Sequence, residues 1–116
     1  MFFDRETMEK LNISVQELKE KIDKGEDFIL LDVREPHEYN FSRIKEKEAM
    51  VVPMMQLPRV VNQLPKDKDI YVICRSGSRS MQATLWLNQQ GFENVKNVDG
   101  GILAWSDYID PTVRKY

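Results

Sequence analysis

Strand-like segments alternate with segments of helical spacing along this chain, and this alternation restricts the possible folds more than any other feature. The strand-like segments are 28–33, 50–52, 69–73 and 94–98. Helical patterns occupy segments 14–24, 37–41, 57–64, 81–90 and 102–108. The apolar runs Phe28–Leu31 and Ile70–Ile73 are typical of strands buried on both faces. The order therefore predicts a three-layer α/β fold, with a central, mainly parallel sheet and helices on both faces.

Capping and breaking residues set the bounds of several of these helices. Ser14 and Glu17 form a capping-box pattern at the start of the first one, and Gly25 is suited to end it. Pro36 favours the start of a short helix, because its fixed backbone angle suits the first helical turn. Gly91 is the expected residue just beyond the long helix that follows the third strand.

The length of 116 residues predicts a single domain over 1–116. A chain of this length buries enough surface to form a core without disulfides. We expect residues 42–48, which are mostly polar, to form a surface loop. The tail from Asp110 onward is predicted to be loose.

Composition and charge exclude several classes of function. A net charge of −2 argues against a nucleic-acid-binding protein, which is usually basic. No apolar run is long enough to cross a membrane, and the N-terminus lacks the pattern of a secretory signal. The single cysteine forms no internal disulfide, which suits a cytoplasmic protein. One His and one Cys are too few for a structural zinc site, so we expect neither a metal nor another cofactor.

The only cysteine, Cys74, lies between the strand that ends at Ile73 and a long helix. Ligands of open α/β sheets bind beyond the carboxyl ends of the strands. The loop after Cys74 can turn its N–H groups inward, and Gly77 permits the backbone angles that such a turn needs. Arg75 and Arg79 add two positive charges. All of these effects favour the thiolate, so the sequence predicts a reactive cysteine with a lowered pKa.

The alternative is an inert, buried cysteine with both arginines directed into solvent. Free cysteines are among the most buried residues in proteins, so this is the usual outcome for a lone cysteine. The strand, tight loop and helix around Cys74, together with the two arginines, favour the reactive interpretation.

Three segments of the chain resemble those of the rhodanese family. They are 32–39 (DVREPHEY), 74–80 (CRSGSRS) and 97–105 (NVDGGILAW). Together they span most of the chain in the family's order, each on the expected element. The stretch Ser42–Ala49 departs from the family, which has a Gly-His-Ile stretch there, and this difference affects the rim of the pocket.

The resemblance implies a sulfurtransferase in which Cys74 is the catalytic nucleophile. Cys74 would take a sulfane sulfur from a small anionic donor such as thiosulfate, a polysulfide or a persulfide. The resulting persulfide would pass this sulfur to cyanide or a thiol, including a thiol of another protein. The substrate-binding loop would consist of Arg75, Ser76, Gly77, Ser78 and Arg79. Asp32 and Arg34 would support this loop as a hydrogen-bonded pair at the end of a neighbouring strand.

Other functions use a similar arrangement of residues. Phosphatases and arsenate reductases also place an arginine after a nucleophilic cysteine, but five residues intervene there and only four do here. A non-catalytic binding module on the same fold would lack the cysteine, which this chain retains. A third alternative is a sulfur carrier whose true partner is another protein.

Overall fold

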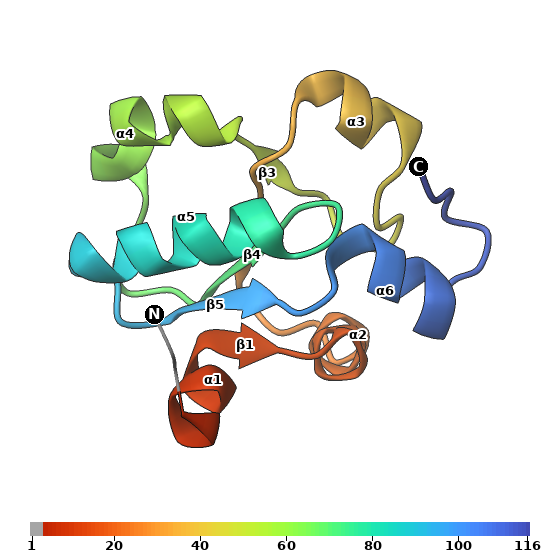
Figure 1. The fold of residues 1–116 in the computed structure, drawn as a ribbon, viewed down its shortest axis with the longest axis horizontal. Helices are drawn as coiled ribbons and strands as arrows, with labels where there is room; N and C mark the ends of the chain where they lie inside the picture. Colours follow the sequence, from red (N-terminus) through yellow and green to blue (C-terminus); the bar gives the residue numbers. More distant parts are fainter. Residues whose placement is uncertain (1–3) are drawn as a thin grey trace.

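A computed structural model describes residues 4–116 and arranges five strands of this part of the chain in one sheet (Figure 1). The strands are β1 (Asn12–Ile13), β2 (Ile29–Asp32), β3 (Met50–Val51), β4 (Ile70–Ile73) and β5 (Val95–Val98). Their order across the sheet is β1-β5-β4-β2-β3, and every neighbouring pair is parallel. The parallel sheet predicted from the sequence is therefore confirmed, with β4 at its centre.

Helices cover both faces of this sheet. The α-helices are α1 (Arg5–Leu11), α2 (Val15–Asp23), α3 (Pro36–Phe41), α4 (Leu57–Val60), α5 (Ser78–Gln89) and α6 (Gly101–Tyr108). In Figure 1, α4 and α5 lie on one side of the sheet and α2 lies on the other. None of the helices within residues 4–116 has the length and apolar character needed to span a membrane.

The central strand β4 contributes side chains to two separate cores. Tyr71 and Ile73 pack with apolar residues of α2 and α6, whereas Val72 and Cys74 pack with those of α4 and α5. This alternation follows from the two-residue period of a strand. Because both faces are covered, Val72 and Cys74 have no exposed surface. Cys74 is thus at the carboxyl end of β4, on the side of the sheet that α5 covers.

The helix predicted over 57–64 is interrupted in the structure. The α-helical part is limited to α4, and short 3₁₀ turns, Met54–Gln56 and Val61–Gln63, flank it. Leu64 has an extended backbone, with ψ of 134°. The following residue, Pro65, disfavours a helical conformation at Leu64, so the segment ends there.

The N-terminal elements α1 and β1 were not predicted from the sequence. Asp4 caps α1 by accepting a hydrogen bond from the Thr7 N–H at 2.8 Å. β1 is only two residues long and pairs with β5, Asn12 opposite Asn97. The pairing partner lies far along the chain, so no local pattern indicated this edge strand.

The prediction of a loose tail from Asp110 is wrong. Val113 is buried, and its carbonyl accepts a hydrogen bond from Ser106 Oγ at 2.7 Å. Ser42 Oγ donates to the carbonyl of Arg114. The apolar side chain of Val113 and these carbonyl groups tie the tail down, and Figure 1 shows it ending beside α3. We call residues 110–116 the C-terminal segment.

Candidate active site

The loop that carries Cys74 turns sharply from β4 into α5. Gly77 caps the helix with φ of 104°, a conformation that disfavours residues with a Cβ. A Cβ at Gly77 would also lie 3.3 Å from the Gly100 backbone nitrogen. α5 starts at Ser78, three residues before the predicted start, so its first N–H groups face the cysteine.

The sulfur of Cys74 is surrounded by hydrogen-bond donors. Gly77 N–H donates to Sγ over 3.1 Å, and Ser80 approaches with its N–H at 3.4 Å and its hydroxyl at 3.2 Å. Burial raises the pKa of the Cys74 thiol, but hydrogen bonds from the Ser80 hydroxyl and from the N–H groups of Ser80, Gly77 and Ser76 outweigh it. The net result is a lowered pKa, in agreement with the sequence-based expectation.

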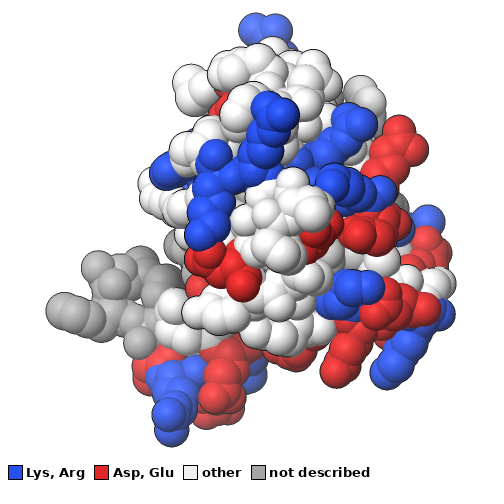
Figure 2. Space-filling view, turned by 90° about the vertical axis from the view of Figure 1, so that its right-hand side faces the viewer, with Lys and Arg blue, Asp and Glu red and all other residues white. Residues whose placement is uncertain are grey.

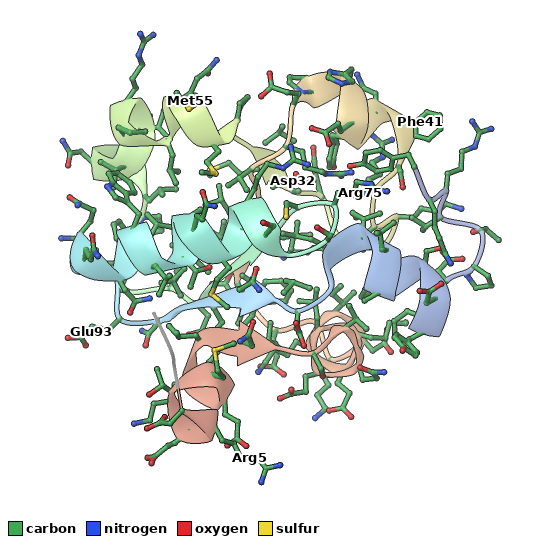
Figure 3. All side chains as sticks on the ribbon, in the orientation of Figure 1. Arg5, Asp32, Phe41, Met55, Arg75 and Glu93 are labelled. Atoms are coloured by element: carbon green, nitrogen blue, oxygen red, sulfur yellow. The ribbon has the colours of Figure 1, made fainter. Side chains whose placement is uncertain are left out.

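The two loop arginines are held at the rim of the site. Arg79 donates two hydrogen bonds of 2.9 Å to the carboxylate of Glu38. Arg75 donates from Nε to the main-chain oxygen of Tyr116, and its guanidinium lies 5.4 Å from the centre of that ring. Figure 3 shows Arg75 near this loop, and Arg5 and Glu93 far from it. The hydrogen bonds of the loop, rather than these arginines, are the largest of the effects that lower the pKa of Cys74.

Glu38 of α3 is a member of the site that we did not single out from the sequence. Besides Arg79, its carboxylate accepts hydrogen bonds from the Glu35 N–H at 2.9 Å and the Tyr116 hydroxyl at 3.0 Å. The bonds from Arg79 are the main reason that the pKa of Glu38 falls to about 2, against the opposing effect of burial. Glu38 therefore joins α3, the active-site loop and the C-terminal segment through one charged group.

Asp32 and Arg34 form a buried ion pair at the end of β2. Arg34 donates to the two carboxylate oxygens of Asp32 at 2.9 and 2.7 Å. Its remaining donors reach the Ser42 carbonyl and the Tyr116 hydroxyl, each at 2.8 Å. Asp32 pairs with Ile73 across the sheet, so the ion pair lies next to the strand end that precedes the nucleophile. The pair thereby links the end of β2 to Ser42 and to the C-terminal segment.

A second glycine lets the start of α6 contact the main chain of the loop. A Cβ on Gly101 would lie 2.4 Å from the Cys74 carbonyl oxygen and 2.6 Å from that of Arg75. Those two carbonyls accept hydrogen bonds of 3.0 Å from the N–H groups of Ile102 and Leu103. The segment 97–105 therefore fixes the backbone of Cys74 and Arg75.

A buried polar chain behind the sulfur also went unpredicted. The Ser80 hydroxyl lies within hydrogen-bond distance of Asn97 Oδ1 as well as of Cys74 Sγ. Asn97 in turn donates from Nδ2 to Asn12 Oδ1 at 2.9 Å. A hydroxyl has one proton, so Ser80 donates to either Asn97 or the sulfur at any moment. The sequence pattern of residues 74–80 cannot reveal this series of hydrogen bonds, because β5 and β1 bring Asn97 and Asn12 to the loop from distant parts of the sequence.

Residues 14–108 match the protein family described as the Rhodanese-like domain. This chain belongs to the rhodanese-like family. A protein of Allochromatium vinosum named Sulfurtransferase is 39% identical over 101 residues, which cover 87% of this chain and 92% of that protein. The family resemblance read from the three sequence segments is therefore confirmed.

Solved structures of rhodanese-like proteins share the fold. A rhodanese-related protein from Thermoplasma volcanium has a TM-score of 0.74 and 35% identity, covering 84% of this chain and 91% of that one. A rhodanese-like domain protein from Staphylococcus aureus has a TM-score of 0.76 and 28% identity, covering 91% and 98% of the two chains. The rhodanese-like α/β fold predicted from the sequence is confirmed.

Proposed function

We propose that this protein transfers a sulfane sulfur from thiosulfate, or from a related polysulfide or persulfide donor, to a thiol or cyanide through a persulfide on Cys74. The observation that carries this proposal is the set of donors around Cys74 Sγ, namely the Gly77 N–H, the Ser80 N–H and the Ser80 hydroxyl. They favour a thiolate, which is the nucleophilic form of cysteine. A lone cysteine of this kind would work in a reducing compartment such as the cytoplasm.

In the first half-reaction, the Cys74 thiolate attacks the outer sulfur of thiosulfate. A new S–S bond forms to Sγ, the bond between the two sulfurs of thiosulfate breaks, and sulfite leaves with the electron pair. Sulfite is a good leaving group, so this step needs neither a metal nor a strong general acid. Cys74 has no exposed surface. A donor therefore reaches Sγ only after a local movement of the groups around it.

In the second half-reaction, the acceptor attacks the outer sulfur of the persulfide. The S–S bond to Sγ breaks, and its electron pair returns to Cys74 as a thiolate. The same N–H groups that stabilise the resting thiolate would stabilise the persulfide anion between the two steps. Splitting the transfer into two displacements is the advantage of covalent catalysis.

The geometry favours sulfur transfer over phosphatase chemistry. A phosphatase needs a ring of donors wide enough for three phosphoryl oxygens, and the loop here is one residue shorter than the phosphatase pattern. Arg79 is also bound through two hydrogen bonds to Glu38, which directs its guanidinium to a carboxylate. We expect no Cys74-dependent hydrolysis of p-nitrophenyl phosphate, and clear turnover would support a phosphatase instead.

A steady-state assay of thiocyanate formation from thiosulfate and cyanide tests the proposal. The parent protein should turn over, and Cys74→Ser should lose all enzyme-dependent product because an alcohol cannot form a persulfide. A thermal melt of the Cys74→Ser variant controls for loss of fold. Retention of activity by a folded Cys74→Ser variant would show that the proposed nucleophile is wrong.

A further inference from the structure

A groove lined by positive charge runs between the end of α3 and the C-terminal segment. It has a volume of about 510 Å³, and its lining includes Phe41, Arg43, Lys45 and Arg114. All four side chains are exposed, Phe41 by 49%. Within residues 4–116, none of the three cations forms an ion pair with Asp or Glu. We call these four residues the basic groove.

A row of two aromatic rings with an arginine at each end connects the basic groove to the active-site loop. Arg75, the residue after the nucleophile, lies 5.4 Å from the centre of the Tyr116 ring. That ring packs edge-on against Phe41 at 5.9 Å, and Arg114 lies 5.4 Å from the Phe41 ring. Each step is within the range of a favourable cation–π or aromatic contact. A molecule bound in the groove would therefore lie along a row of side chains that ends at Arg75, the residue after Cys74.

The charge of this region is opposite to that of the whole chain. The chain carries a net charge of −2, yet segments 40–45 and 110–116, which border the groove, contain four basic residues and one acidic residue, Asp110. Hydrogen bonds from Thr112 lower the pKa of Asp110, and Lys45 helps to lower it. Figure 2 shows Lys and Arg side chains gathered over the upper part of this face, with Asp and Glu mainly below them. A local field of this kind attracts an anionic partner even when the net charge of the protein does not.

We propose that the basic groove binds an acidic segment of a partner protein, and that this partner presents a cysteine thiol to the persulfide on Cys74. The inference rests on the proposed function and names the class of its acceptor. A small inorganic donor needs only the loop, whereas the groove adds the exposed Phe41 ring and three cations that form no ion pair with Asp or Glu within residues 4–116. Charge complementarity and an aromatic contact are the features by which protein interfaces recognise acidic partners.

The transfer is balanced without any additional reactant. The thiolate of the partner attacks the outer sulfur of the Cys74 persulfide, and an S–S bond forms on the partner. The S–S bond to Sγ breaks, so Cys74 recovers its electron pair as a thiolate and the partner leaves as a persulfide. The acidic residues of the partner act only in binding, which separates their effect from the sulfur chemistry.

Binding can be measured without sulfur transfer. The probe is a fluorescent acidic peptide with Asp and Glu around a central serine, and the comparison peptide has Asn and Gln at the same places. Fluorescence anisotropy should show that the acidic peptide binds the parent protein at least about 10-fold more tightly at low salt, with the difference lost at high salt. Arg43→Glu with Arg114→Glu should abolish the preference.

A matched control keeps the change in net charge but moves it away from the groove. Arg5 and Arg59 are also exposed, and Figure 3 shows Arg5 on the opposite side of the molecule from the loop. Arg5→Glu with Arg59→Glu should leave the peptide preference intact. If both double variants lost the preference for the acidic peptide equally, net charge alone would explain the preference. That result would overturn the proposed surface.

Transfer is then measured from protein whose Cys74 has first been loaded with sulfur by thiosulfate. For this measurement each peptide carries a cysteine in place of the central serine. The acidic peptide should accept sulfur about 10-fold faster than the neutral peptide. This difference in rate should be seen only with proteins whose groove residues are unchanged. Thiocyanate formation from thiosulfate and cyanide should be the same in all variants. If Cys74 takes up no sulfur, the proposed function fails, while the anisotropy result still decides whether the surface exists.

Three results would overturn the inference. The first is equal affinity for acidic and neutral peptides. The second is displacement of the acidic peptide by vesicles of anionic phospholipid or by single-stranded polynucleotide when the competitor supplies fewer negative charges per volume than the peptide does. That result would assign the groove to phosphate groups. The third is a dimer of this chain that Arg43→Glu with Arg114→Glu dissociates, which would assign the groove to a second copy.

Discussion

The Ser80 hydroxyl lies 3.2 Å from Cys74 Sγ, inside the first turn of the helix that follows the nucleophile. Ser80 has no exposed surface, so water cannot replace this hydrogen bond. The contact makes Ser80 the largest single contributor to the lowering of the Cys74 pKa, acting against the effect of burial. The reactivity of the thiol therefore depends on a residue six positions further along the chain.

Replacement of this hydroxyl should weaken the nucleophile. Ser80→Ala should raise the pKa of Cys74 and slow its alkylation at neutral pH by about 10-fold, the effect of losing one hydrogen bond to a charged group. Thr84→Val is a matched control, because Thr84 is buried on the same helix and its hydroxyl has no hydrogen-bond partner within residues 4–116. An unchanged pH profile of alkylation in Ser80→Ala would contradict the assigned role.

The ion pair between Glu38 and Arg79 should make stability depend on pH in a defined range. The folded-state pKa of Glu38, about 2, lies below its ordinary value of 4.5. Its contribution is therefore complete above pH 4.5 and is lost as the pH falls towards 2. Glu38→Gln should lower the free energy of unfolding by about 1 to 2 kcal/mol at neutral pH, since Arg79 is partly exposed and water screens the pair.

Urea unfolding of the parent and Glu38→Gln at several pH values measures this difference. The difference in the free energy of unfolding between the two proteins should be constant above pH 4.5 and should become smaller below it. Glu35 has an exposed side chain one turn earlier, so Glu35→Gln is the control and should show a smaller gap. A gap that does not change with pH would show that Glu38 acts through packing alone.

Gly101 should be intolerant of any side chain, because of the close approach of the Cys74 and Arg75 carbonyls. Gly101→Ala should cost about 3 kcal/mol or more of stability and should reduce sulfur transfer by displacing the loop. Gly25 also has a positive φ, 66°, but no atom lies within 4 Å of a Cβ built there. Gly25→Ala should lower the free energy of unfolding by only about 1 kcal/mol, the cost of placing a residue with a Cβ in a left-handed backbone conformation. Equal costs for the two variants, measured by denaturant unfolding, would argue against the steric explanation.

The hydroxyl of Tyr116 should stabilise the protein by joining two charged groups. It accepts from Arg34 at 2.8 Å and donates to Glu38 at 3.0 Å. Tyr116→Phe should lower the free energy of unfolding by about 1 to 2 kcal/mol, because a donor of the buried Arg34 loses its best partner. Tyr108 is 70% exposed, and Tyr108→Phe should change stability by less than about 0.5 kcal/mol. No difference between the two variants would mean that the Tyr116 hydroxyl contributes nothing to stability through Arg34 and Glu38.

The fold and the position of Cys74 at the end of a strand could be predicted because their signals are local. Apolar runs mark β2 and β4, the Ser14–Glu17 capping box marks the start of α2, and the strand–loop–helix order places Cys74 at the end of a strand. Both residues of that capping box make the expected contacts, with the Glu17 N–H donating to Ser14 Oγ at 3.0 Å.

The parts that escaped prediction depend on contacts between distant residues. Glu38 reaches Arg79 across 41 positions, and Tyr116 reaches Arg34 across 82. The tail beyond Asp110 has few apolar residues and no periodicity, so nothing in it indicated that Val113 would be buried. The basic groove could not be predicted either, because it forms only when the C-terminal segment lies beside α3.

Intact-protein mass spectrometry after exposure to thiosulfate tests the central claim most directly. The parent protein should gain the mass of one sulfur atom, cyanide should remove it, and Cys74→Ser should gain nothing under the same conditions. Parallel exposure to sulfite should add no sulfur atom, because sulfite has no sulfane sulfur to give. A parent protein that gains no sulfur from thiosulfate or a polysulfide, or a Cys74→Ser variant that still gains it, would contradict the account.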